Sequence, residues 1–104
     1  MLENEKPGAI ITLEEGVLLT SAYRAENPKA IRAFLIDGNL VRQVLDQEGC
    51  VSIRIYNGID EKDGKPSPVI VGVTADNEDM TAGLLLDRAY RCPPHAALNS
   101  ALNG

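Results

Sequence analysis

The sequence predicts a small α+β domain in which about three N-terminal helices pack on a small antiparallel sheet of two or three strands. Hydrophobic residues recur at helical spacing over residues 12–45 and then alternate, as in a strand, from residue 50. A chain of 104 residues with 44% hydrophobic content is typical of a single globular domain. We therefore expect a lead-in over residues 1–11, one domain over 12–91 and a proline-containing C-terminal tail over 92–104.

The first helix is expected to begin at Thr12. Thr12 and Glu15 form a capping box, in which each side chain can bond to the backbone N–H of the other residue. Asn27 and Pro28 then end this helix and begin a second one, because asparagine caps helices and proline is favoured in the first turn. The apolar stripe of the second helix is formed by Ala30, Ile31, Phe34 and Leu35.

A third, short helix is expected over Leu40–Leu45. Gly38 suits the left-handed residue that terminates the helix before it, and Gly49 stops the third helix. Because the helices come first and the strands follow, the helices should cover one face of the sheet.

The strands begin after Gly49. Val51, Ile53 and Ile55 alternate with polar residues, which predicts a strand with one buried face. Residues 69–75 are apolar on both faces near their middle, as in a central strand, and a long polar loop over 60–68 joins the two into a hairpin. Residues 83–90 favour a third strand, although their leucines also suit a helix. The acidic residues that precede them, over 76–79, lack the order of a calcium loop and indicate a solvated turn.

Charge and composition argue against several classes of protein. Fifteen acidic and ten basic residues give a net charge of −5, and there is no basic stripe with interleaved aromatics, so we expect neither nucleic acid nor an anionic membrane as a partner. The N-terminus has no export-signal pattern and no apolar run approaches a membrane span. Two cysteines without an export signal suggest reduced thiols in the cytoplasm, whereas a Cys50–Cys92 disulfide would imply that such a signal had been removed.

The segment Arg91–His95 holds the least ordinary residues of the chain. Cys92 and the single histidine, His95, have Cys-x-x-His spacing, which can place two ligands on one zinc ion. A structural zinc needs four ligands, so Cys50 and a carboxylate would have to complete the site. A Cys50–His95 catalytic pair is disfavoured, because Cys50 follows the negative end of a helix and no glycine-rich oxyanion loop accompanies it.

The order of short motifs over residues 12–95 resembles that of small bacterial proteins, chiefly of the Bacteroidetes type, that carry a C-terminal Cys-Pro-Pro-x-Cys motif. The matching motifs here are Asn27-Pro28, "QEGC", "RIY", "VIVGV" and Cys92-Pro93-Pro94. His95 follows in the motif, but Ala96 stands where the second cysteine of the family would be, which removes a thiol pair. The resemblance implies no particular function.

These observations favour a non-enzymatic protein-interaction domain that self-associates as a homo-oligomer, without a cofactor. A small sheet leaves strand edges exposed, and a symmetric dimer is an economical way to cover them. The candidate contact residues are Arg54, Tyr56, Leu84, Leu86 and Tyr90. One alternative is a metal- or thiol-dependent module centred on Cys50, Cys92 and His95. Another is an enzyme with a concave pocket lined by arginine, tyrosine and carboxylates.

Overall fold

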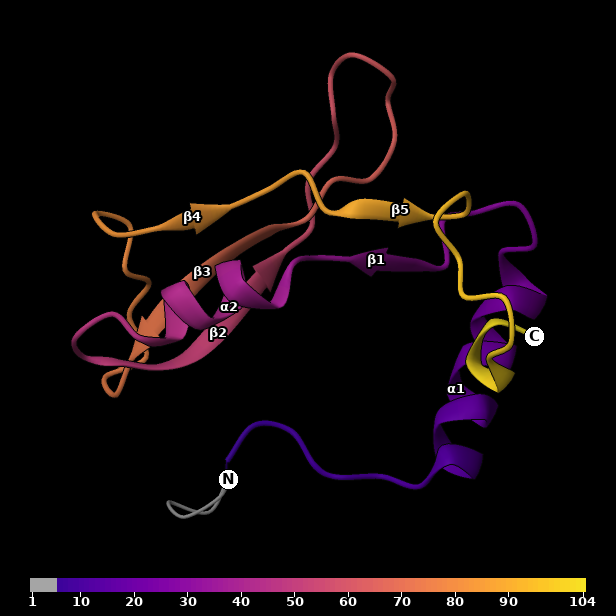
Figure 1. The fold of residues 1–104 in the computed structure, drawn as a ribbon, viewed down its shortest axis with the longest axis horizontal. Helices are drawn as coiled ribbons and strands as arrows, with labels where there is room; N and C mark the ends of the chain where they lie inside the picture. Colours follow the sequence, from indigo (N-terminus) through magenta and orange to yellow (C-terminus); the bar gives the residue numbers. More distant parts are fainter. Residues whose placement is uncertain (1–5) are drawn as a thin grey trace.

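The computed structural model describes residues 6–104, so the first five residues of the expected lead-in lie outside the described residues. Two α-helices, five strands and a 3-10 helix make up the fold of this part of the chain (Figure 1). In chain order these elements are α1 (Leu13–Glu26), β1 (Ala33–Leu35), α2 (Gly38–Leu45), β2 (Cys50–Tyr56), β3 (Val69–Thr74), β4 (Leu85–Leu86), β5 (Tyr90–Cys92) and η1 (Ala101–Asn103).

A three-stranded antiparallel sheet in the order β2-β3-β4 forms the centre of the molecule. The expected hairpin is confirmed, with Ile53 opposite Gly72 and Ile55 opposite Ile70. Helix α2 lies over this sheet (Figure 1). The Val44 side chain of this helix is completely buried. The buried apolar residues of the described chain are few and mostly small; they are Val44, Ile70, Val71, Val73 and Cys92.

The first helix is confirmed together with its cap. Thr12 Oγ1 accepts a hydrogen bond from Glu15 N at 3.1 Å, so the side chain satisfies one of the free N–H groups of the first turn. The third predicted helix is also present as α2, but Gly38 does not terminate a preceding helix. It is the first residue of α2, and Asp37 caps that helix by accepting from Leu40 N at 3.2 Å.

The prediction of a second helix after Pro28 is wrong. Two of its apolar residues, Phe34 and Leu35, lie instead in β1. This strand pairs antiparallel with β5 in a separate two-stranded sheet, with Ala33 opposite Cys92 and Leu35 opposite Tyr90. The partner strand lies far along the chain, so local hydrophobic spacing contains no sign of it. The fold is therefore α+β with two α-helices and two small antiparallel sheets over residues 6–104.

The predicted third strand is divided into two short ones. Strand β4 pairs with β3, and β5 pairs with β1, in different sheets. Arg88 lies between them with φ of 61°, a left-handed conformation that interrupts a strand. This residue redirects the chain from one sheet to the other.

The N-terminal helix α1 was expected to pack on the sheet, but it packs on neither of the two sheets. Within residues 6–104, the only element that α1 contacts extensively is η1, near the C-terminus (Figure 1). The radius of gyration is 15.5 Å, whereas a compact domain of this length has about 13 Å. The expectation that helices cover one face of the sheet therefore holds for α2 alone.

Candidate interaction surfaces

Arg54 and Tyr56 form a polar cluster with the turn that follows β3. Both side chains leave the same face of β2, since they lie two residues apart. The Arg54 guanidinium donates to the carboxylate of Asp79 and to the side-chain oxygen of Asn77, and the Tyr56 hydroxyl donates to the other oxygen of Asp79. The cluster thus ties the edge strand β2 to the turn beyond β3.

The ionisable groups of this cluster shift one another's pKa values. Hydrogen bonds from Tyr56 and then from Arg54 hold the pKa of Asp79 below its ordinary value. In return, the hydrogen bond to Asp79 raises the pKa of Tyr56 and that of Arg54. Arg54 and Tyr56 are therefore occupied by a contact within the chain.

Sequence reasoning missed the role of Asp79. It treated the acidic residues over 76–79 as a solvated turn, whereas Asp79 forms an isolated bridge opposite Val73 and its side chain contacts β2. Asn77 adopts a positive φ of 68° in the same turn. An Asn-containing acidic turn directly after a strand was the available signal, because asparagine tolerates left-handed backbone at turns.

A second polar cluster fixes the long loop between β2 and β3. Arg91 in β5 donates from Nε to Pro66 O at 2.7 Å and from Nη1 to Asp63 at 2.8 Å. A backbone hydrogen bond from Lys65, and then Arg91, lower the pKa of Asp63. The long polar loop is thus held at its tip by β5 of the second sheet.

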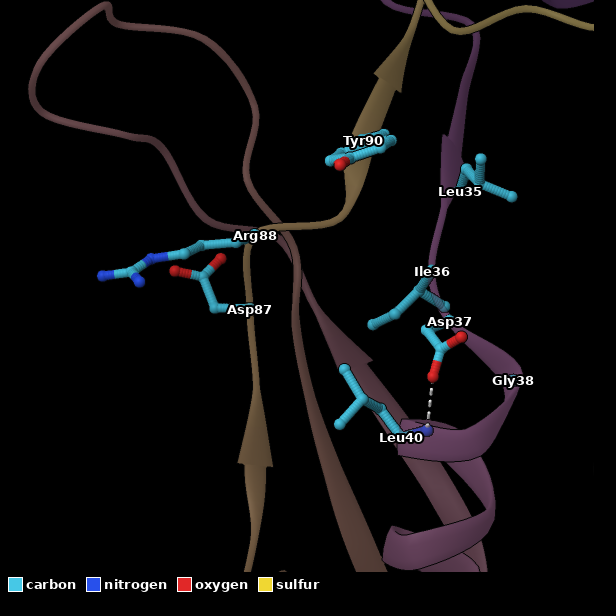
Figure 2. Close-up of a pocket in the computed structure, with 8 residues that line it drawn as sticks. All are labelled: Leu35, Ile36, Asp37, Gly38, Leu40, Asp87, Arg88 and Tyr90. Atoms are coloured by element: carbon cyan, nitrogen blue, oxygen red, sulfur yellow. Dashed lines mark hydrogen bonds between the residues drawn. The ribbon is translucent and has the colours of Figure 1, made fainter.

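A hollow with a volume of about 580 Å³ lies between β1, the start of α2 and the chain around Arg88 (Figure 2). Its eight lining residues are Leu35, Ile36, Asp37, Gly38, Leu40, Asp87, Arg88 and Tyr90.

These residues include the arginine, tyrosine and carboxylates that a small-molecule site would need, but they do not converge on it. Asp37 caps α2, Asp87 accepts from Ser67 Oγ at 2.7 Å, and Arg88 extends away from Ile36 and Leu40 in Figure 2. The hollow therefore offers an apolar wall and carboxylates that are already hydrogen-bonded elsewhere.

Cys50, Cys92 and His95 do not assemble into a ligand set. The buried Cys92 thiol donates to the His95 carbonyl oxygen at 3.1 Å, and the His95 ring stacks on Tyr90 with centroids 4.3 Å apart. Cys50 belongs to the other sheet, where its sulfur lies beside Gly72. Both cysteines are free thiols, and no three His, Cys, Asp or Glu side chains are grouped to hold a metal ion within residues 6–104.

The remaining predicted contact residues lie on or near β4 and β5. Leu84 is partly exposed, and its N–H donates to Gln47 Oε1 at 2.8 Å, while Leu86 is half-buried. Tyr90 is exposed apart from its stacking on His95. Leu85, which was not predicted, is more exposed than Leu86.

Large hydrophobic side chains are exposed along most of the described chain. Two groups stand out by their density, one on α1 and the segment before it, and the other on β2. The first group contains Ile10, Ile11, Leu13, Leu18, Leu19 and Tyr23. The second contains Val51, Ile53, Ile55 and Tyr56. Isolated exposed leucines are ordinary, whereas these two groups each contain several exposed apolar residues and are therefore the candidate interaction surfaces of the described residues.

The total accessible surface of this chain is larger than that of a compact monomer of the same mass. It is 8446 Å² for a chain of 11.2 kDa, whereas a folded monomer of that mass exposes about 5,700 Å². Even if residues 1–5 are assigned the full surface of an unfolded chain, they account for at most about 900 Å² of the excess. At least about 1,800 Å² per chain is therefore exposed beyond what a compact monomer leaves to solvent.

Protein-family models, curated protein sequences and solved structures show no significant match to this chain. Within residues 6–104, no helix combines the length and the apolar character that crossing a bilayer requires.

Proposed function

We propose that this chain is a small protein-interaction domain that self-associates and has no catalytic activity of its own. The observation that carries the proposal is the excess of exposed surface, on which many large apolar side chains lie. Specific interfaces bury about 800 Å² per partner, and obligate homodimers bury more. The excess of about 1,800 Å² per chain matches an obligate interface.

The small internal core leads to the same proposal. The largest completely buried side chain in the described residues is Val44, whereas six large apolar residues at and before α1 remain exposed. Burial of apolar surface contributes about 25 cal/mol per Å², so leaving this surface in water forgoes much of the stabilisation that the sequence offers. A second polypeptide that covers it would restore that stabilisation.

The net charge of the chain determines how its self-association should depend on salt concentration. With a net charge of −5 per chain, two copies repel each other at long range, and salt screens this repulsion over about 8 Å at ~0.15 M. An association driven by apolar burial should therefore persist or strengthen as salt is added. An association through ion pairs would weaken instead.

Sedimentation equilibrium of the full chain tests the proposal. The protein is purified without chelator, kept reduced, and measured from about 1 to 200 μM at about 0.05 and 0.5 M NaCl. We expect twice the chain mass of 11.2 kDa at micromolar concentration and at both salt concentrations. A species that stays at the single-chain mass at the highest concentration would contradict the proposal. Native mass spectrometry of the same sample reports any bound metal.

A further inference from the structure

Two sulfur-containing side chains from different segments meet over Gly72, in the middle of β3. A Cβ atom at Gly72 would lie 2.9 Å from Cys50 Sγ and 3.2 Å from Met80 Sδ, so the two sulfur atoms approach the same point above the strand. Residues 6–104 contain one other sulfur-containing side chain, that of Cys92, and it belongs to the other sheet. The fold therefore gathers two of these three side chains at a position that has no side chain of its own.

Both residues are held in place by the backbone of the three-stranded sheet. Cys50 begins β2 opposite Thr74, and its N–H donates to Gln47 O at 3.0 Å. The Met80 N–H donates to Gly72 O at 2.8 Å. Because neither residue lies on a free loop, the two sulfur atoms are positioned in advance of any ligand.

The two sulfur atoms are also available to a ligand. The Cys50 thiol donates to Ser52 O at 3.3 Å, a long contact for a weak donor. Cys50 and Met80 are both half-buried, so an ion can reach them from solvent. The Gln47 amide approaches the same position, but two hydrogen bonds to backbone groups hold it.

The chemistry of this pair selects the kind of ion. Thiolate and thioether are soft ligands, which favour Cu(I). A structural zinc needs four ligands, and no three His, Cys, Asp or Glu side chains are grouped in the part of the chain that the structure describes. A thiolate-bound ion lies about 2.3 Å from sulfur, so two sulfurs that share it are about 4.6 Å apart, within the limit of about 6 Å that their distances to the Gly72 position set.

We propose that Cys50 and Met80 form a binding site for Cu(I). When the ion binds, the S–H bond of Cys50 breaks and its proton passes to water. The thiolate and the Met80 thioether then each donate an electron pair to the ion. Nothing is oxidised or reduced in this step. The net charge of −5 favours the approach of a cation, and the site does not depend on the proposed self-association.

Anaerobic titration with Cu(I) tests the site. The reduced full chain competes for the ion with the chromogenic chelator bicinchoninate, which gives both stoichiometry and affinity. We expect one ion per chain, and we expect Cys50→Ser to abolish its binding. Met80→Leu nearly conserves the side-chain volume. It should weaken binding by at least about tenfold, because even the outer partners of a metal ligand contribute that much.

Cys92→Ser is the matched control, because it removes the other thiol of the chain and should leave Cu(I) binding unchanged. Circular dichroism checks that each variant keeps its helices and strands. Equal affinity in Met80→Leu would show that the thioether takes no part and would overturn the paired site. Loss of binding in a folded Cys92→Ser variant, or half an ion per chain, would place the ion elsewhere. An unmodified protein that cannot compete with the chelator would also overturn the proposal.

A second measurement uses the unmodified protein, in case a variant fails to fold. Ag(I), a soft ion of the same charge, is added to protein labelled with ¹³C in its methionine methyl groups. The Met80 methyl signal, identified by its NOEs to Gly72, should shift and reach its end point at one equivalent. An unchanged signal while the ion is bound would overturn the site. Sedimentation equilibrium without added metal tests the proposed function separately, so either proposal can fail while the other holds.

Discussion

Replacing Val44 with alanine tests the packing of α2 on the three-stranded sheet. The Val44 side chain has no exposed surface, and its carbonyl accepts from Gln47 Nε2 at 2.8 Å. Alanine keeps that backbone hydrogen bond, so the substitution removes only the two methyl groups that pack against the sheet. The change in stability therefore reports the side-chain contact alone.

The expected loss follows from the two methyl groups. Their transfer to water costs about 1.6 kcal/mol, and the cavity that remains adds a further ~1 kcal/mol. We expect the free energy of unfolding to fall by about 2–3 kcal/mol, with a decrease in Tm of about 10 °C. Few other residues in the described chain are buried as deeply, so packing elsewhere should not compensate for the lost stability.

Urea denaturation and thermal scans measure the effect at one fixed protein concentration, because an associating protein has a concentration-dependent Tm. Leu98→Ala is the control, since Leu98 is almost wholly exposed and its truncation should change stability by less than about 0.5 kcal/mol. If Val44→Ala is no more destabilising than Leu98→Ala, α2 does not contribute to the core as described.

Four further substitutions test the turns, the polar clusters and the start of α2. Because the pKa of Asp79 is lowered in the folded chain, the stability from its ionised form is present above the unfolded pKa of about 4 and is lost as the pH falls through the folded pKa. Denaturation from about pH 7 to 2 should show a smaller acid-induced loss for Asp79→Asn. Gly58→Ala should destabilise the hairpin by about 2 kcal/mol, because its new Cβ would clash with the Ser67 carbonyl oxygen. Gly38→Ala, whose new Cβ would meet only the Arg42 guanidinium at 3.7 Å, an ordinary van der Waals contact, should be neutral or slightly stabilising in the same denaturation assay. Arg91→Ala should speed amide hydrogen exchange in the β2–β3 loop by roughly tenfold or more while leaving β3 unchanged; equal exchange in the loop would show that Arg91 does not hold it.

The elements with local signals were predictable from the sequence. The cap of α1 needs only Thr12 and Glu15, and the β2–β3 hairpin needs only alternation over two nearby runs. The segment Ala33–Leu35 became a strand because a partner far along the chain offered it a ladder, which outweighs helical spacing over so few residues. The sequence also predicted only a proline-containing tail over residues 92–104. In the fold, Ser100 caps η1 and Arg24 bonds to Leu102.

The candidate surfaces were predictable only in part. Arg54 and Tyr56 were identified as contact residues, but their partner Asp79 could not be assigned without the turn geometry. The N-terminal helix was expected to cover the sheet, but its leucines are exposed, because helical apolar spacing indicates that a face will be packed and not what packs on it.

The contacts of Arg24 and Arg32 with the C-terminal segment, here called the clasp, also determine how force passes through this chain. Arg24 holds the Leu102 carbonyl, and Arg32, just before β1, holds Asn103. A pull on the C-terminus therefore loads these arginine contacts first, and through them α1 and the entrance to β1. The three-stranded sheet lies beyond that junction. In a pulling experiment the clasp should open before the β2–β3 hairpin separates, so the molecule has a weak link at one end and a stronger one at its centre.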